Sequence, residues 1–169
     1  MPEIKRIYRQ SLPEMKLVGR CYGENDKCNG TFSNKWEEWF KNDLFSPLKL
    51  EGGGAEPFAD CDAYIGLCRI KEGEPFQYWI GVFLPPDAPV PAGYESVALD
   101  ALDIAVCWVY GKEPDIYSFC CLSALREAGY EWTADSSGVK WYFERYVCER
   151  FLKPDEKGNL ILDMCYAVK

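Results

Sequence analysis

The sequence predicts an α+β fold in which one antiparallel sheet carries two helices around a central cleft. Strand-like runs make up most of the regular pattern, two amphipathic helical segments interrupt them, and the second half of the chain repeats the order of elements in the first. The 169 residues, 48% of them hydrophobic, suffice for one compact domain. We therefore expect a single domain over residues 1–169, with pseudo-symmetric strand-helix-strand-strand repeats at about 1–84 and 93–169.

The first repeat opens with two strand-like runs, residues 4–9 and 16–22, and a polar loop leads from them to Ser33. Ser33 suits the N-cap of a helix, and Pro47 ends the helical pattern that follows. Apolar residues recur in this pattern at spacings of three and four, which places them on one face of the helix: Trp36, Trp39, Phe40 and Leu44.

A glycine run, Gly52-Gly53-Gly54, links this helix to two further strand-like runs, residues 61–70 and 76–84. The glycine run lacks the Lys-Ser/Thr of a phosphate-binding loop, so we interpret it as a flexible turn. The polar segment 71–75 between the two strand-like runs predicts a β-hairpin.

Residues 85–91 are too rich in proline for a helix or a strand and predict a bridge between the repeats. Residues 94–100 and 103–110 are strand-like again. A helix is expected over residues 114–128, where proline suits the first helical position and Gly129 suits the C-terminal end. The order of elements therefore matches that of the first half.

The last strand-like runs, residues 140–148 and 160–168, form the second predicted hairpin. When the halves are aligned by eye, residues 62–68 match residues 142–148, and Tyr64 becomes the counterpart of Glu144. A strand-helix-strand-strand unit cannot bury its sheet face alone, so the two copies are expected to pack about a pseudo-twofold axis. The cleft between them is the expected ligand site.

Charge and missing residue types exclude several kinds of chemistry. The formal net charge is -8 and Lys and Arg form no cluster, which argues against direct binding of nucleic acid. The chain has no histidine, so it offers no Ser-His-Asp or Cys-His nucleophile and no His-based metal site. We expect neither a metal nor a cofactor.

The nine cysteines include no Cys-x-x-Cys pair and lie mostly in apolar runs, so we expect free, reduced thiols in the core. The adjacent Cys120 and Cys121 fall inside the predicted helix and are interpreted in the same way. No run approaches the roughly 20 apolar residues of a membrane span, and the N-terminus lacks the apolar stretch of a secretory signal. The expected location is the cytoplasm.

The most informative residue is Glu144, which lies in the aromatic run over residues 141–146. The two-residue period of a strand places Tyr142, Glu144 and Tyr146 on one face. A glutamate in a strand is most often solvated. If Glu144 is buried instead, its pKa rises unless a cation or hydrogen-bond donors restore the charge, and a delocalised cation between aromatic walls would do so. A carboxyl with a raised pKa beside tyrosines could equally serve acid-base catalysis.

Other aromatic residues are candidates for the walls of a cleft. Trp36, Trp39 and Phe40 have the spacing of core residues, although a helix over a cleft can also contact a ligand. Tyr64 is a candidate because of its symmetry with Glu144. Further candidate ligand contacts come from the predicted strands: Trp79, Trp108, Tyr110, Tyr142 and Tyr146.

Six segments carry a family resemblance: residues 12–19 (LPEMKLVG), 78–82 (YWIGV), 90–94 (VPAGY), 105–111 (AVCWVYG), 143–146 (FERY) and 162–169 (LDMCYAVK). In this order and spacing they resemble the bacterial GyrI-like small-molecule-binding domain. The same domain forms the effector-binding half of AraC-type and MerR-type multidrug regulators. The resemblance spans nearly the whole chain.

The resemblance implies a tandem fold with a central cleft, in which an acid at Glu144 meets cationic or polar groups of a ligand. It favours burial of Glu144 over exposure to solvent. Some stand-alone relatives hydrolyse cyclopropane-bearing DNA-alkylating natural products, using an acid and aromatic residues of the same cleft. Unlike the regulators, this chain has no room for a helix-turn-helix domain, so direct operator binding is not expected.

We therefore expect a stand-alone protein that binds lipophilic, aromatic or cationic small molecules in its cleft, for sensing or sequestration. The alternative is a hydrolase that opens cyclopropane rings, with Glu144 as general acid/base or water activator and Tyr64 or Tyr110 orienting the leaving oxygen. A third class of function is a protein-partner module that acts through its acidic surface.

Overall fold

The computed structural model describes residues 1–49, 60–146 and 148–169, so Gly52-Gly53-Gly54 and Val147 lie outside the described residues. The first half contains strands β1 (Glu3–Leu12), β2 (Met15–Tyr22), β3 (Tyr64–Lys71) and β4 (Gln77–Leu84), with helix α1 (Ser33–Lys41) between β2 and β3. The second half contains β5 (Glu95–Leu99), β6 (Leu102–Gly111), β7 (Val139–Tyr146) and β8 (Leu160–Val168). Its helices are α2 (Leu122–Glu127) and α3 (Glu149–Leu152), and a short 3-10 helix, Asp115–Ser118, precedes α2.

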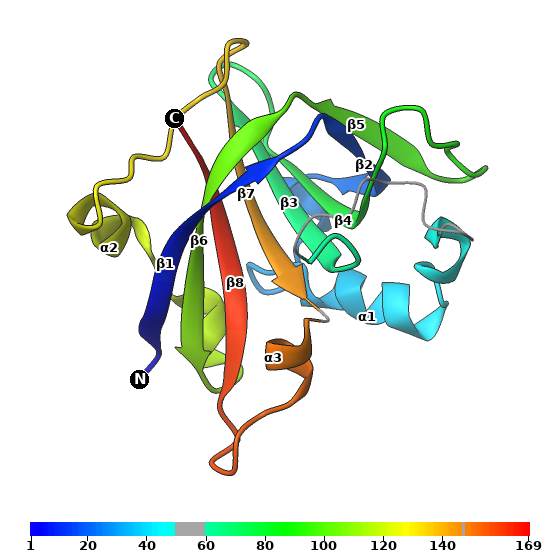
Figure 1. Ribbon diagram of the computed structural model, residues 1–169. Coiled ribbons are helices and arrows are strands. Elements are labelled where there is room, and N and C mark those ends of the chain that lie inside the picture. Colours follow the sequence, from blue (N-terminus) through cyan, green and yellow to red (C-terminus); the bar gives the residue numbers. More distant parts are fainter. Residues whose placement is uncertain (50–59, 147) are drawn as a thin grey trace.

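The described strands form one antiparallel sheet in the order β1-β6-β8-β7-β3-β4-β2-β5 (Figure 1). This order is symmetric about the central pair β7–β3, as expected for two strand-helix-strand-strand repeats. The leading strand of each half pairs within the other half, β1 with β6 and β5 with β2. The β3–β7 pair joins the halves into one continuous sheet, and each half also supplies the edge strand of the other.

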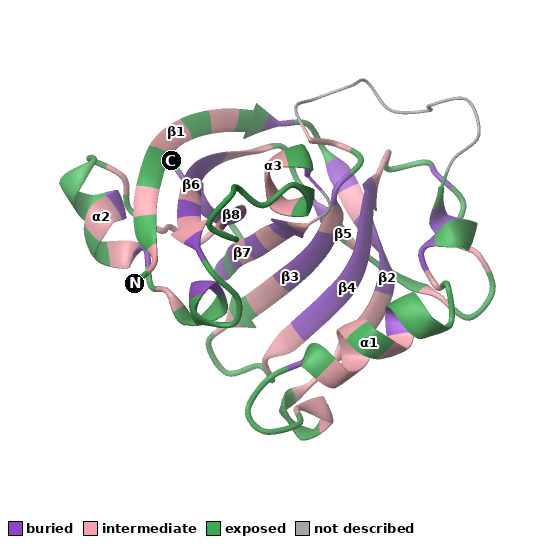
Figure 2. Ribbon diagram, turned by 90° about the horizontal axis from the view of Figure 1, so that it is seen from below, coloured by how far each residue is buried: buried purple, intermediate pink, exposed green. Residues whose placement is uncertain are grey.

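The sheet is strongly curved (Figure 2). Its two faces carry separate cores. On the inner face, residues from both ends of the sheet share one cluster, among them Leu12 of β1, Leu99 of β5 and Phe143 of β7. On the outer face, α1 covers the first-half strands with Trp39, and the segment containing α2 covers the second-half strands with Leu125. The two outer clusters leave the middle of this face to a cleft.

The predicted strands and both predicted hairpins are confirmed, with small shifts at their ends. The first helix is also confirmed, although Ser33 is its first residue and Phe32 takes the cap position that we expected for Ser33. Gly129 follows the end of α2 with a φ of 86°, and its N–H donates to the carbonyl of Arg126 at 3.0 Å. A glycine suits this left-handed conformation after a helix.

The single helix expected over residues 114–128 is wrong. Residues 119–121 separate the 3-10 helix Asp115–Ser118 from α2, and the backbone of Phe119 is extended. The sequence of this segment explains the break, because aromatic, β-branched, serine and cysteine residues are weak helix formers and Phe119 packs into the outer core instead. Cys120 and Cys121 consequently precede α2 rather than lying within a helix.

The strand expected over residues 140–148 is too long, because β7 ends at Tyr146 and Cys148 is the N-cap of α3. Helix α3 has four residues and was not predicted, since so short a segment shows no helical period. This difference matters for function, because α3 contributes to the cleft.

The nine cysteines are free thiols, and four of them, Cys107, Cys121, Cys148 and Cys165, are buried. Cys28 and Cys120 are exposed, so the expectation of core thiols does not hold for these two. Among the described helices, none combines the length and the apolar character needed to span a bilayer.

Candidate ligand-binding site

The cleft lies on the outer face of the sheet, between α1 on one side and the 3-10 helix with α3 on the other. Strands β3, β4 and β7 contribute its floor, and its volume is about 1060 Å³. This volume is at the upper end of the range for drug-sized ligands. Two kinds of side chain dominate the lining. The aromatic ones are Phe32, Trp36, Phe40, Tyr64, Tyr78, Tyr117, Tyr146 and Phe151, and the acidic ones are Glu37, Glu113, Asp115 and Glu144.

Glu144 stands on the floor of the cleft, held by two tyrosines of its own strand. Its Oε1 accepts a hydrogen bond from the Tyr142 hydroxyl at 2.9 Å, and its Oε2 accepts one from the Tyr146 hydroxyl. The side chain is partly exposed to the cleft. The two-residue period of β7 produces this arrangement, because it places all three residues on the outer face.

Burial raises the pKa of Glu144 above its ordinary value, and the hydrogen bonds from Tyr146 and Tyr142 only partly oppose this shift. Burial and the nearby Glu144 charge in turn hold the pKa values of Tyr142 and Tyr146 well above 10, so both hydroxyls stay protonated as donors. Among the described residues that line the cleft, none is Lys or Arg. The carboxylate therefore lacks a neighbouring cation within the lining.

Aromatic rings surround Glu144 in close, defined contacts. Trp36 of α1 lies over the floor, with its ring centroid 4.6 Å from that of Tyr146 and its Nε1 donating to the Tyr78 hydroxyl at 2.9 Å. The Tyr78 ring stacks on Phe32 with centroids 4.2 Å apart. Tyr64 at the edge of the floor stacks on Phe45, which belongs to the core under α1. Helix α1 and strand β4 thus build one aromatic wall, which the Trp36–Tyr78 hydrogen bond fixes.

Gly66 of β3 makes this wall possible. It lies directly opposite Glu144 in the β3–β7 pair. A Cβ atom at Gly66 would overlap the Tyr78 hydroxyl and would come within 3.2 Å of the Trp36 ring. The absence of a side chain therefore lets both rings approach the sheet beside the carboxylate.

The opposite wall and the mouth are more open and carry acids. Glu113 and Asp115 lie at the 3-10 helix, and the Tyr117 hydroxyl donates to the Glu113 carboxylate. Large apolar side chains stay exposed around the mouth: Phe40 at 56%, Tyr117 at 39% and Leu152 at 56%. With Glu37 on α1 and Glu144 on the floor, every charged lining residue among those described is acidic.

The structure brings several predicted site residues together. Glu144, Tyr64, Trp36 and Tyr146 line the cleft. Tyr142 packs beside it in the outer core and contacts Glu144 through its hydroxyl rather than lining the space. In the β3–β7 pair Tyr64 is directly opposite Tyr146, and its relation to Glu144 by pseudo-symmetry stays a prediction.

Other predicted contacts lie outside the cleft. Trp39 is fully buried under α1, where its Nε1 donates to the Tyr22 hydroxyl at 2.9 Å. Trp79 and Trp108 pack against the inner core because strand alternation turns them to the opposite face from the cleft. Tyr110 lies at the end of β6, where its hydroxyl donates to Asp155 and accepts from Asn159 at 2.9 Å.

Sequence reasoning missed residues that the fold brings to the cleft from separate segments: Phe32, Tyr78, Glu113, Asp115, Tyr117 and Phe151. Strand alternation places Tyr78 and Trp79 on opposite faces of β4, so it marks one of the two as facing the cleft without deciding which. Tyr117 and Phe151 belong to short helices without a periodic pattern, so no local signal marked them.

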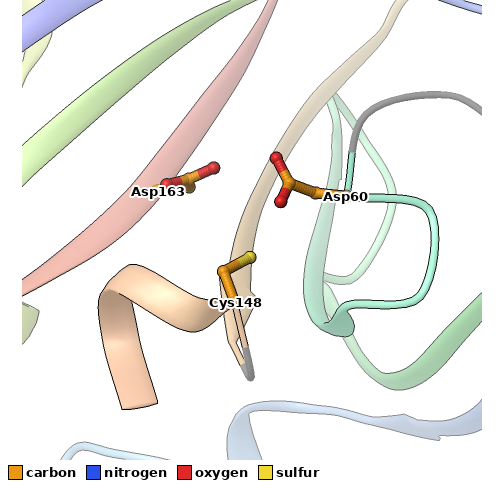
Figure 3. Close-up of side chains that lie close together, drawn as sticks. All are labelled: Asp60, Cys148 and Asp163. Carbon is orange, nitrogen blue, oxygen red and sulfur yellow. The ribbon is translucent and has the colours of Figure 1, made fainter. Parts of the chain in front are cut away.

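A buried group of side chains lies on the inner face, behind Glu144. Figure 3 shows the carboxylates of Asp60 and Asp163 above the Cys148 thiol, and potential ligand atoms of these three residues lie within 4.8 Å of one another. Both carboxylates bind guanidinium groups. The Nε atoms of Arg145 and Arg150 donate to Asp163 at 2.8 and 2.6 Å, and Arg150 also reaches Asp60. The group is therefore organised as an ion-pair network, with its acids already engaged.

Comparisons with known proteins bear on the fold. No family model matches the chain, and a search of curated proteins finds no match. A Staphylococcus aureus protein ascribed to bacterial transcription regulation has a similar structure, with a TM-score of 0.63 and 19% identity, over 97% of this chain and 98% of that one. The structure of SAV2435 bound to tetraphenylphosphonium is similar at a TM-score of 0.63 and 18% identity, covering 97% and 94%.

An integron cassette protein from the mobile metagenome of Vibrio cholerae is also similar, with a TM-score of 0.52, 12% identity and 99% coverage of both chains. At these identities the likeness concerns the fold alone. It establishes the α+β architecture that the resemblance to the GyrI-like small-molecule-binding domain implied.

Proposed function

We propose that this protein binds lipophilic aromatic cations in the cleft, with Glu144 as the central anionic contact, and serves in sensing or sequestration. One observation carries the proposal: a carboxylate with a raised pKa stands among aromatic rings, with no Lys or Arg among the described lining residues. A positively charged ligand would supply the missing counter-charge. The bound cation would offset the cost of keeping the desolvated carboxylate charged.

The walls suit a delocalised charge. Trp36 and Tyr146 are in tilted ring contact beside Glu144, and Phe32 and Tyr78 continue the aromatic surface. A cation over such a ring gains about 0.5 to 2 kcal/mol. The acids Glu37, Glu113 and Asp115 add a negative field at the mouth that favours the approach of cations. Binding of tetraphenylphosphonium by the structurally similar SAV2435 supports this class of ligand.

A thermal-shift measurement with tetraphenylphosphonium tests the proposal, with neutral triphenylphosphine oxide as the matched ligand. At 100 times the dissociation constant, the cation is expected to add about 2.7 kcal/mol to the free energy of unfolding. Glu144→Gln should remove this stabilisation. Glu127→Gln, an exposed change in α2 outside the cleft, should leave it intact. Equal stabilisation by the neutral compound would reject a role for charge.

The hydrolase alternative rests on the same carboxyl, because an acid with a raised pKa beside a tyrosine can transfer protons near neutral pH. In this cleft Tyr146 takes the position beside the acid, since Tyr110 bonds to Asp155 and Asn159 elsewhere. Repeated turnover of a cyclopropane-bearing alkylating compound by the wild type, lost in Glu144→Gln, would support catalysis. Consumption that stops at one equivalent would reject it.

A further inference from the structure

The ion-pair network behind the cleft is centred on a buried pair, Arg145 and Asp163. The side chain of Arg145 is 2% exposed and that of Asp163 is 0% exposed, and two guanidinium nitrogens of Arg145 lie 2.8 Å from Asp163 Oδ2. Arg145 extends the network to β1, where it donates to Gln10 at 2.8 Å and to Tyr8 at 3.3 Å. Strands β1, β7 and β8 are thus tied together on the inner face.

Arg150 connects α3 to this network. Its Nε donates to Asp163 Oδ1 at 2.6 Å, and its two terminal nitrogens donate to Asp60 at 3.2 and 3.0 Å. The guanidinium also lies over the Trp108 ring, 5.0 Å from its centroid. Two carboxylates and a ring therefore fix the Arg150 side chain from several directions. A planar guanidinium suits such a multiple contact better than an ammonium does.

The two residues after Arg150 belong to the cleft. Phe151 and Leu152 line its mouth, and the Phe151 ring meets Tyr146 edge to face at 5.3 Å. Helix α3 has only four residues, too few to be stable by its own hydrogen bonds. Its position must come from contacts outside the helix, and the ion pairs of Arg150 are the strongest polar contacts that the described residues offer it.

We propose that Arg150 is a positioning residue of the cation site. By holding α3 against Asp60 and Asp163, it places Phe151 and Leu152 at the mouth and makes the cleft select bulky aromatic cations over slim ones. This inference rests on the proposed function. The expected selectivity depends on the size of the cation. A slim cation contacts only Glu144 and the floor, whereas a cation with several rings also extends to Phe151.

Two probes separate positioning from simple stability. The dissociation constants of tetraphenylphosphonium and benzyltrimethylammonium are measured for the wild type, Arg150→Lys, Phe151→Ala and the double variant. Arg150→Lys keeps the positive charge and avoids leaving Asp60 without a cation, so it is the variant most suited to fold. Lys153→Met is the control, because Lys153 pairs with Glu149 at the exposed side of α3.

Arg150→Lys is expected to weaken binding of tetraphenylphosphonium about three- to tenfold, the change that corresponds to loss of an aromatic contact, and to change benzyltrimethylammonium binding less than about twofold. In the Phe151→Ala background it should cause a smaller loss than in the wild type, because Arg150 acts largely through Phe151. The control should match the wild type.

Three results would overturn the inference: unchanged binding of both cations, equal loss for both, or losses of Arg150→Lys and Phe151→Ala that simply add. A lower unfolding temperature with unchanged affinity ratios would identify Arg150 as structural only. If the wild type binds neither cation, the proposed function itself fails, and that outcome is distinct from a wild type that binds both cations while Arg150→Lys leaves the ratio of the two affinities unchanged.

Discussion

Glu144 and Gly66 are direct neighbours across the central β3–β7 pair. The hydroxyl of Tyr78 and the ring of Trp36 occupy the space that a side chain at Gly66 would take. The aromatic wall can therefore lie beside Glu144 only while residue 66 has no side chain. This relationship joins the two halves of the chain, because Glu144 lies in the second and Gly66, Tyr78 and Trp36 lie in the first.

Gly66→Ala should disturb the wall next to Glu144. A methyl group there overlaps Tyr78, and overpacking of this kind costs about 1 to 3 kcal/mol. We expect a loss of that size in the free energy of unfolding in urea, together with weaker binding of tetraphenylphosphonium. Gly23→Ala is the matched control, because a Cβ there meets nothing within 4 Å. Equal stability of the two variants would contradict the tight approach.

Affinity for cations should rise with pH. The folded-state pKa of Glu144 lies above the ordinary value of 4.5, so near and above 4.5 part of the carboxyl is still protonated and must lose its proton when a cation binds. Calorimetry in buffers of different ionisation enthalpy should detect proton release in this window. Glu144→Gln should show none. Affinity that is constant from pH 4.5 to 8 would contradict the assigned shift.

The same shift affects the empty protein. Because the folded-state pKa is raised, the contribution of Glu144 to stability is largest below pH 4.5 and is lost as pH rises through the folded-state pKa. Glu144→Gln removes this loss, so without ligand the variant should be more stable than the wild type at neutral pH. Urea unfolding at low and neutral pH measures the difference. A variant that is less stable at neutral pH would oppose a desolvated carboxylate.

Tyr142→Phe should change the site without changing its lining. The substitution removes a donor that stabilises the Glu144 carboxylate, so the pKa of Glu144 should rise further. Loss of such a bond costs the charged form about 1.5 to 3 kcal/mol. The pH at which cation affinity reaches half its maximum should move upward. Tyr166→Phe, a change at a neighbouring ring that does not bond to Glu144, is the control.

The fold and the site differ in how far the sequence could predict them. Strands such as β4 and β6 carry long apolar runs, and turn residues separate the strand-like segments, so the order of the elements was predictable. The Tyr142, Glu144 and Tyr146 group was predictable as well, because it depends only on alternation within one strand. Trp79 and Tyr78 show the limit: alternation separates them, but only the packing of the whole sheet determines which one faces the cleft.

The remaining site residues depend on contacts between distant segments. Tyr117 reaches the cleft because the expected helix over residues 114–128 is broken, and Phe151 does so because a four-residue helix follows β7. Neither feature has a hydrophobic period. The same holds for Arg150, whose partners Asp60 and Asp163 are far from it in sequence.

The most direct measurement is the calorimetric titration of tetraphenylphosphonium into the wild type and into Glu144→Gln at neutral pH. We predict one saturable site in the wild type and an affinity at least about tenfold lower in the variant, as expected when a favourable contact of about 1.4 kcal/mol is lost. Equal affinities in the two proteins, or no binding by a folded wild type, would contradict the central role of Glu144.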